Sequence, residues 1–315
     1  MINKEPLLVV ENLKQHFKVN RKFTVKAVDG ISFKIYPGET YGLVWESGWG
    51  KSTTGRSIIR LYKPTSGNII FNGKNISGKM SHEEIKLLRT KMQMIFQDPM
   101  ACLNPRKKVL DIIGEGLDIH KMYSTKEERN EKVYNILEKV GLSREHASRY
   151  PHQFSGGQRQ RIGIARALIM DPDLIIADEA ISALDVSIQA QVVNLMKEIQ
   201  KETNTAYLFI THDLSMVNYI SDRIGVLHLG HLVEAGTTEE IFSNPIHPYT
   251  KSLLSAIPSP NPLVEKNRTV FSYDAHEAGV DYSKGKEFLV EGTHTVLATE
   301  EELARWTKKD QEIAK

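Results

Sequence analysis

The sequence has 315 residues, a formal net charge of +2 and a single cysteine, Cys102. A chain of this length can bury a substantial core in one or two domains. The nearly balanced charge gives no sign of a nucleic-acid partner, and a single cysteine excludes an intramolecular disulfide and fits a reducing compartment. The sequence has no run of eighteen apolar residues, so we expect any membrane role to depend on partner proteins.

Strand patterns dominate the N-terminal region. Leu7–Val10, Leu13–Val19 and Thr24–Ile35 are rich in β-branched and apolar residues, and the last segment ends just before a Pro-Gly pair. No helical pattern occurs before these segments end. The region is therefore predicted to form an antiparallel sheet at one edge of the fold.

A candidate phosphate-binding loop follows an apolar strand predicted at Thr40–Val44. Such a loop surrounds phosphates with backbone N–H groups, places a lysine on the β and γ oxygens, and holds Mg²⁺ with a Ser or Thr hydroxyl. A helix is expected directly after it. The candidate ATP-binding residues here are Ser47, Gly48, Trp49, Gly50, Lys51, Ser52 and Thr53.

Trp45 makes this loop pattern incomplete, because the pattern requires glycine at that position. Glycine there permits a positive φ or a close backbone approach, and a tryptophan is expected to obstruct at least one of them. Left-handed strain would cost roughly 1–2 kcal/mol, about a tenfold loss of nucleotide affinity. Two alternatives stay open. Either ATP still binds and is turned over, or the loop is occluded and the chain binds ATP weakly or not at all.

Two helix-capping patterns, Ser81-x-x-Glu84 and Thr125-x-x-Glu128, flank another candidate. Gln97 follows an apolar strand and precedes a loop marked by proline. Its amide could reach Mg²⁺ or a water molecule at the strand end, and a surface glutamine is the alternative.

The segment 154–185 joins several chemically distinct pieces without a gap. Ser155–Gln158 stands at the start of a predicted helix, where unpaired N–H groups and the helix dipole suit an anion such as phosphate. A buried strand predicted at Leu174–Ala177 ends in two carboxylates. Ligands bind at the carboxyl ends of strands in α/β sheets. In phosphoryl transfer one carboxylate holds the metal and another group positions water, so Asp178 is the metal candidate and Glu179 the candidate base.

His212 ends another apolar strand, predicted at Ala206–Ile210. A lone histidine is usually structural or solvated, but one at this place can hydrogen-bond a γ-phosphate and the attacking water. Further along, a hairpin is predicted around Gly230 and His231. Near the C-terminus we expect a strand at Phe288–Val290 and a glutamate-rich helix after Thr299.

The segment from Phe154 to Asp185 resembles the signature motif, Walker B motif and D-loop of an ATP-binding cassette (ABC) subunit. Phe154 stands where many members have leucine, and Ala180 where importers usually have proline. The resemblance implies an α/β P-loop NTPase core, with an antiparallel β edge sheet and a helical subdomain inserted at about residues 100–150. It also implies that the signature completes the ATP site of a partner subunit. These signature residues are Ser155, Gly156, Gly157 and Gln158, and Asp185 belongs to the D-loop.

The same resemblance implies roles for three further residues. Gln97 matches the Q-loop and His212 the switch histidine. Phe17 lies roughly where ABC subunits carry the aromatic residue that stacks on adenine, although ordinary packing explains it equally well and Phe23 competes for the role. The resemblance implies ATP and Mg²⁺ as cofactors, with Ser52, Gln97 and Asp178 serving the metal.

Residues 244–254, NPIHPYTKSLL, resemble the C-terminal region of the oligopeptide/dipeptide group of ABC importers. This resemblance implies an ATP-binding domain at 1–255 and an extension at 256–315. The implied function is ATP hydrolysis that drives peptide import, and the alternative is a non-hydrolysing regulatory subunit with a defective loop at Trp45. No iron–sulfur cluster is expected, because no cysteine follows Cys102.

The same resemblance implies a set of partners and a location. They are a second ABC ATP-binding subunit, forming a heterodimer, two transmembrane permease subunits and an extracytoplasmic peptide-binding protein. The chain would lie at the cytoplasmic face of the cell membrane as a peripheral subunit.

Overall fold

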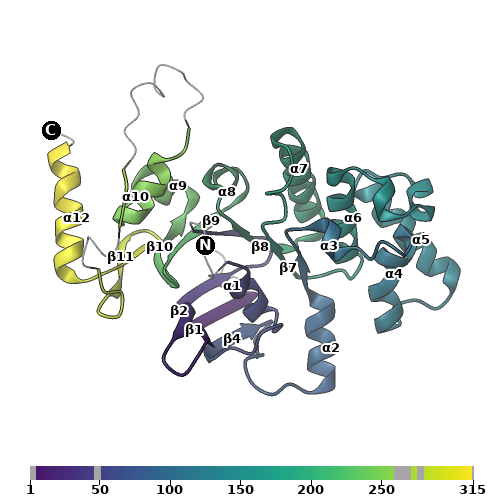
Figure 1. Ribbon diagram of the computed structural model, residues 1–315, viewed down its shortest axis with the longest axis horizontal. Coiled ribbons are helices and arrows are strands. Elements are labelled where there is room, and N and C mark those ends of the chain that lie inside the picture. The colour runs from purple at the N-terminus through teal and green to yellow at the C-terminus, as the bar shows by residue number, and fades with distance from the viewer. Residues whose placement is uncertain (1–4, 46–50, 259–270, 275–279, 314–315) are drawn as a thin grey trace.

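The computed structural model describes residues 5–45, 51–258, 271–274 and 280–313. Its centre is an eight-stranded mixed sheet in the order β11-β12-β10-β9-β3-β8-β7-β6 (Figure 1). The strands from β9 to β6 pair in parallel, and the remaining pairs are antiparallel. The parallel strands are β6 (Met92–Ile95), β7 (Leu174–Asp178), β8 (Ala206–Thr211), β3 (Thr40–Val44) and β9 (Arg223–His228).

A four-stranded antiparallel sheet, in the order β2-β1-β4-β5, packs beside the central sheet. This confirms the predicted edge sheet, with one correction. The two strands expected between residues 7 and 19 form one strand, because a bulge at Asn12, whose φ is +46°, lets the chain continue without a break. The strands are β1 (Leu8–Lys18), β2 (Thr24–Ile35), β4 (Ser66–Phe71) and β5 (Lys74–Asn75).

Alternate residues of the central strands face two separate cores. In β7, Ile175 and Ala177 pack with the helices on one side, whereas Leu174 and Ile176 pack with α1 (Lys51–Ile58) and the antiparallel sheet on the other. Both faces are therefore apolar, which is why these strands read as continuous hydrophobic runs. Polar groups are left mainly at the strand ends.

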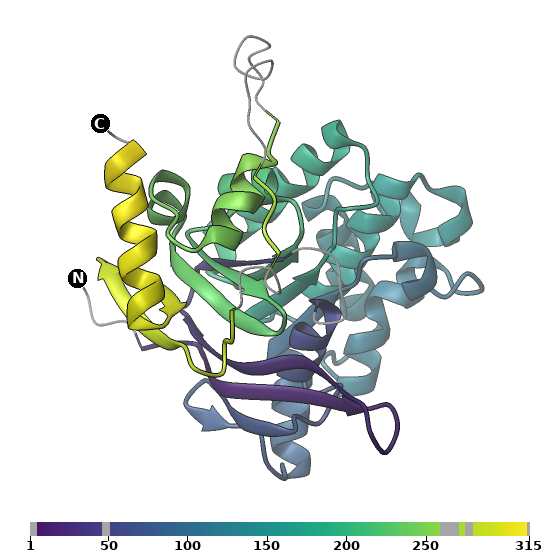
Figure 2. The same ribbon diagram turned by 60° about the vertical axis from the view of Figure 1, so that its left-hand side comes forward.

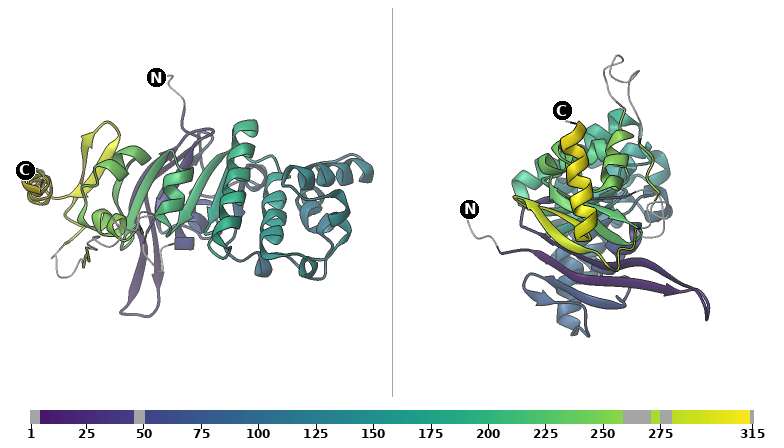
Figure 3. Two further views of the ribbon diagram at one scale, coloured as in Figure 1. Left: turned by 90° about the horizontal axis from the view of Figure 1, so that it is seen from above. Right: turned by 90° about the vertical axis from the view of Figure 1, so that its left-hand side faces the viewer.

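Residues 99–153 form only helices and turns, and they extend from one end of the molecule (Figures 1 and 3). The capping box predicted at Ser81 is present, and Thr125 caps its helix by accepting from the backbone N–H of Glu128. Helix α2 (His82–Lys91) precedes this region. The helices within it are α3 (Pro99–Cys102), α4 (Val109–His120), α5 (Lys126–Lys139), and the 3-10 turns η1 (Arg144–Ser148) and η2 (Pro151–Gln153). Three helices follow in the core, namely α6 (Gly156–Leu168), α7 (Val186–Thr203) and α8 (Leu214–Ile220).

The C-terminal elements lie at the opposite end of the molecule from α4 and α5 (Figures 2 and 3). The predicted hairpin is formed by β9 and β10, and the predicted strand and helix near the C-terminus are confirmed. A second strand, β12, was missed, and it pairs with β10 so that the extension continues the central sheet. The elements are β10 (His231–Thr237), α9 (Thr238–Ser243), α10 (Pro248–Ser255), β11 (Lys286–Glu291), β12 (His294–Ala298) and α12 (Glu300–Ile313). None of the helices in the described ranges combines the length and apolar composition of a membrane span.

Candidate functional site

The candidate residues gather at the carboxyl ends of neighbouring parallel strands. The register pairs Ile95 of β6 with Ala177 of β7, and Asp178 of β7 with Ile210 of β8. On the other side of β8, Val44 of β3 is opposite Thr211. Gln97, Asp178, Glu179 and His212 therefore lie at the same end of the sheet as the carboxyl end of β3. This is where open α/β sheets bind ligands.

Glu179 is held in an unusual backbone conformation. Its φ is +48°, in the left-handed region, and the residue is 5% exposed. Its N–H donates to the carbonyl of Ile210 at 2.9 Å, and its own carbonyl accepts from the N–H of Ser182 at 3.2 Å and from the hydroxyl of Ser182 at 3.0 Å. A non-glycine residue in this region costs on the order of 1–3 kcal/mol and persists only where surrounding contacts fix it. Such strain is typical of functional sites.

The Glu179 carboxylate contacts His212. Oε1 of Glu179 lies 3.1 Å from Nδ1 of His212, and the histidine side chain is 52% exposed while that of Glu179 is 6% exposed. Asp178, next to Glu179, is 1% exposed. The buried carboxylate of Glu179 therefore contacts a histidine whose ring solvent or a substrate can reach. The catalytic roles of Glu179 and His212 stay predictions.

The phosphate-loop candidates are only partly described. Ser47, Gly48, Trp49 and Gly50 lie outside the described residues. Lys51 begins α1, and Ser52 and Thr53 follow in its first turn. Gly55 allows α1 to pack closely, because a Cβ there would lie 2.9 Å from Ile176 and 3.0 Å from Ile210. The start of α1 is thus tied to the two strands that carry the acids and the histidine.

Trp45 is buried rather than strained. It is 5% exposed and packs in the core that faces α1 and the antiparallel sheet. It is not among the described non-glycine residues with positive φ, so the left-handed strain considered for this position is absent. Its indole N–H is buried without a hydrogen-bond partner in the described part of the chain, an arrangement that costs free energy. Trp45 therefore departs from the glycine of the loop pattern in the bulk of its side chain and not in its backbone conformation.

The signature residues form a helix start, as predicted. Ser155 caps α6 in a capping box, accepting from the N–H of Gln158 while the Gln158 side chain accepts from the N–H of Ser155. Gly157 is required by packing, because a Cβ there would lie 2.6 Å from Ile188 of α7. Ser155 and Gly156 are exposed, so this corner is free to meet a ligand or another protein. Asp185 is exposed at the N-cap of α7.

The candidate adenine-stacking residue has an aromatic neighbour. Phe17 is half-buried, with its ring edge-on to Tyr62 and 5.6 Å between the centroids. The competing Phe23 is 57% exposed. Tyr62 lies just beyond α1, so Phe17 lies near the helix that follows the phosphate loop. Its role in nucleotide binding stays a prediction.

The candidate metal ligands fit Mg²⁺ by their chemistry. The described residues contain no group of three or more His, Cys, Asp or Glu that could enclose an ion. Ser52, Gln97 and Asp178 offer instead a hydroxyl, an amide and a carboxylate. Mg²⁺ prefers oxygen donors and is commonly held by one or two carboxylates together with substrate phosphates. The donor set therefore suits a metal that arrives with a nucleotide.

Ser182 was missed as a site residue, because it was read only as part of a turn. It fixes the carbonyl of Glu179 through both its N–H and its hydroxyl. A serine three residues after a candidate catalytic acid is the local signal that could have identified it.

The fold and the strand-end residues define an ATP-binding cassette. Residues 28–182 match the family described as "ABC transporter", and residues 233–288 match "Oligopeptide/dipeptide transporter, C-terminal region". Among solved structures, cbiO1 from Clostridium perfringens, part of the ABC transporter complex cbiONQ, has a TM-score of 0.67 and 29% identity, covering 76% of this chain and 92% of that one. The ATP-binding cassette MJ0796, a dimer in a post-hydrolysis state bound to ADP and Pi, has a TM-score of 0.66 and 27% identity over 73% of this chain and 98% of its own.

Two similar proteins show which group of ATP-binding cassettes this chain resembles. The oligopeptide transport ATP-binding protein OppF of Bacillus subtilis (strain 168) is 62% identical over 95% of this chain and 98% of its own. The dipeptide transport ATP-binding protein DppF of Lactococcus lactis subsp. cremoris is 53% identical over 96% of this chain and 98% of its own. The chain belongs to the ABC transporter ATP-binding proteins, in their oligopeptide/dipeptide group.

Proposed function

We propose that this chain hydrolyses ATP to drive the import of oligopeptides or dipeptides through a membrane ABC transporter. The observation that carries the proposal is the 3.1 Å contact between the buried carboxylate of Glu179 and His212 at the ends of adjacent strands. A carboxylate in this position can polarise a water molecule, and an exposed histidine beside it can contact the γ-phosphate. The names of the relatives support the peptide substrate.

Each residue at the sheet edge has a separate task in this proposal. Lys51 and the loop amides hold the phosphates, while Ser52, Asp178 and Gln97 hold Mg²⁺, which neutralises charge on the transferred phosphoryl group. Glu179 orients and polarises the attacking water. His212 holds the γ-phosphate end of the substrate in line, and Phe17 stacks on adenine.

The exposed corner at Ser155–Gln158 acts on the ATP held by a second cassette. Ser155 and Gly156 are exposed, and the capping box between Ser155 and Gln158 fixes the backbone. A preformed helix N-terminus therefore faces outward. The dimeric state of a solved relative supports such pairing. We propose a heterodimer with another ABC ATP-binding subunit, in which Asp185 lies at the contact.

The remaining partners follow from the transport role. Two permease subunits would contact the helical subdomain at about residues 100–150, and an extracytoplasmic binding protein would deliver peptides. The chain would be a peripheral subunit at the cytoplasmic face of the membrane. In this proposal residues 1–255 are the ATP-binding domain and residues 256–315 an extension of the peptide-importer type.

A second candidate function is a regulatory subunit that does not hydrolyse ATP. The buried indole of Trp45, where the loop pattern calls for glycine, favours it. Such a chain would contribute its signature residues to a competent partner while its own nucleotide site stays weak.

Titration of the purified chain with Mg-ATP separates the two functions. Nucleotide binding is followed by tryptophan emission, and phosphate release is measured for the chain and for the Glu179→Gln variant, with and without the permease complex. Glu198→Gln on α7 is the matched control, because Glu198 is exposed and away from the strand ends. Binding with release that depends on Glu179 and not on Glu198 supports hydrolysis. Absence of binding, or release that survives Glu179→Gln, would overturn it.

A further inference from the structure

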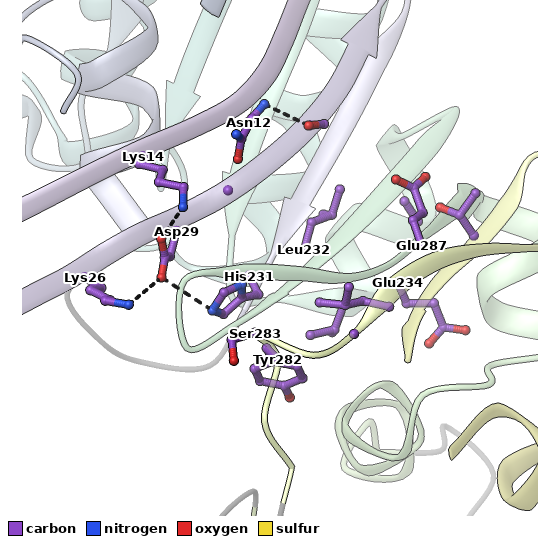
Figure 4. A pocket seen from close by; sticks show the side chains of 17 residues that line it. Asn12, Lys14, Lys26, Asp29, His231, Leu232, Glu234, Tyr282, Ser283 and Glu287 are labelled. Atoms are coloured by element: carbon purple, nitrogen blue, oxygen red, sulfur yellow. Dashed lines mark hydrogen bonds and ion pairs between the residues drawn. The ribbon is translucent and has the colours of Figure 1, made fainter. Parts of the chain in front are cut away.

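A cavity of about 410 Å³ lies between the antiparallel sheet, β10 and the C-terminal extension (Figure 4). Its volume is within the range of small-molecule sites. Three parts of the chain that are far apart in sequence supply its walls. The cavity is away from the edge where Glu179 and His212 meet, because β10 belongs to the other end of the central sheet. Its lining residues include Lys14 and Lys26, His231 and Leu232, and Glu287 and Leu297.

One end of the cavity carries a surplus of positive charge. The ammonium groups of Lys14 and Lys26 lie 3.4 Å and 3.1 Å from the carboxylate of Asp29. Two ammonium groups share one carboxylate, which leaves one positive charge uncompensated. The Asp29 carboxylate is 9% exposed and is also bonded to His16, so its position is fixed. Lys26 is the more accessible of the two lysines, with 63% of its side chain exposed.

The other end carries a negative charge. Glu287 of β11 is exposed, and its carboxylate forms no hydrogen bond or ion pair with any described residue. Another acid in the lining, Glu234, is already bonded to His294 and to two backbone N–H groups. Figure 4 shows Lys14 and Lys26 on one side of Leu232 and Glu287 on the opposite side. The apolar side chains of Leu232 and Leu297 lie in the lining of the same cavity.

We propose that this cavity binds a short peptide as a zwitterion. The peptide carboxylate lies at Lys14 and Lys26, its ammonium group lies at Glu287, and apolar side chains cover Leu232 and Leu297. A polyphosphate is disfavoured, because Asp29 neutralises one of the two lysines and Glu287 repels a second anionic group. A purely apolar ligand would leave the charges at both ends desolvated and unpaired.

The site goes beyond the transport function, and its test does not depend on ATP hydrolysis. Its walls join the antiparallel sheet to the extension, so a bound peptide would contact both parts at once. A ligand that binds only the folded arrangement stabilises it by mass action. The cavity would therefore allow imported peptide to act on the subunit from inside the cell.

The test titrates the nucleotide-free chain with leucyl-leucine at low ionic strength, followed by calorimetry. N-acetyl-leucyl-leucine lacks the ammonium group and leucyl-leucine amide lacks the carboxylate. A charge-assisted hydrogen bond is worth about a tenfold change in affinity or more. Each blocked peptide is therefore expected to bind at least ~10-fold more weakly than the free one. Leucine alone tests whether the cavity takes a free amino acid.

Two variants test which residue binds each end of the peptide. Glu287→Gln is expected to weaken leucyl-leucine ~10-fold and to leave the acetylated peptide unchanged. Lys26→Gln is expected to weaken leucyl-leucine and to leave the amide unchanged. Glu291→Gln is the matched control, since Glu291 is exposed on the same strand but outside the lining. Circular dichroism establishes that each variant is folded.

The outcomes are separate from those of the ATPase test. Binding that follows this pattern supports the site even if phosphate release is absent. Lack of binding, equal binding of the blocked peptides, an equal effect of Glu291→Gln, or binding of leucine as tight as that of leucyl-leucine would overturn the proposal.

Discussion

Nδ1 of His212 lies 3.1 Å from Oε1 of Glu179, and the two residues come from adjacent parallel strands, each just past its carboxyl end. The acid is buried and the histidine half-exposed. The pair therefore has an inner member fixed by the protein and an outer member that can reach a substrate. Their separation depends on the pairing of β7 with β8 and on the left-handed backbone at Glu179, whose N–H donates to the carbonyl of Ile210 in β8.

The first prediction concerns His212. His212→Ala removes the outer member of the pair and should lower phosphate release by ~10²-fold, because loss of a group that holds the reacting phosphate in line can cost that much. ATP binding should persist, since the loop and metal candidates are untouched. Rapid-mixing phosphate assays and nucleotide titrations measure the two quantities. His82→Ala is the control, because His82 is exposed at the start of α2. Equal release by the His212 variant and the unmodified chain would contradict this role.

The second prediction concerns Trp45. Replacing it with glycine restores the loop pattern and removes the bulk of a buried indole, so ATP affinity should rise. The same change should lower the free energy of unfolding by about 3–5 kcal/mol, because a large core side chain is lost. Equilibrium denaturation and ATP titration give the two values.

Trp306→Gly is the matched control for Trp45→Gly. Trp306 is equally buried, at 6% exposure, but packs in the small cluster beneath α12. The Trp306→Gly variant should be less stable than the unmodified chain, and its ATP affinity should not change. If Trp45→Gly leaves the affinity unchanged as well, the indole does not obstruct the nucleotide.

The positions of the strand ends could be predicted because their signals are local. A buried strand followed by two acids, or by Thr-His-Asp, marks its own end, and β7 and β8 end at those residues. The positive φ of Glu179 could not be predicted. It depends on a hydrogen bond to Ile210 of another strand and on the turn closed by Ser182, and neither pairing is visible along the sequence.

The C-terminal extension shows the same limit. Its strand at 288–290 and its helix were predicted from composition, but the strand beginning at His294 was not. β12 pairs with the neighbouring strand β11, but it also pairs with β10, and His294 contacts Glu234, sixty residues earlier. Contacts between such distant residues leave no periodic pattern, so tertiary context decides them.

The third prediction concerns this buried contact. The Glu234 carboxylate accepts from the N–H of Ile246 at 2.6 Å, the N–H of His247 at 3.0 Å, and Nε2 of His294 at 2.7 Å. Glu234→Ala leaves all three buried donors without their partner, so the free energy of unfolding should fall by about 3–5 kcal/mol. Urea denaturation measures it. Glu239→Ala, on the exposed face of α9, should change stability by less than about 0.5 kcal/mol. Similar losses in the two variants would show that the contact contributes little.

The last prediction concerns pH and Glu240, which joins α9 to the extension. Its carboxylate accepts from the N–H of Thr237 and from the N–H and hydroxyl of Thr293. Burial, the largest influence, raises its pKa, but the hydrogen bonds from Thr293 and Thr237 together outweigh it and lower the pKa from 4.5 to about 2. A pKa depressed in the folded state means that the folded state binds fewer protons. The stabilisation is therefore fully present above pH ~4.5 and is lost as the pH falls toward 2.

Denaturation of the chain and of Glu240→Gln between pH 6 and pH 2 measures this contribution, with about half a pH unit between points. The unmodified chain should be the more stable above pH ~5, and the difference should shrink through the interval from about 4.5 to 2. Glu239→Gln, one residue earlier and exposed, is the matched control and should follow the unmodified chain. A difference between Glu240→Gln and the unmodified chain that does not change with pH would mean that the carboxylate acts through its shape and not through its charge.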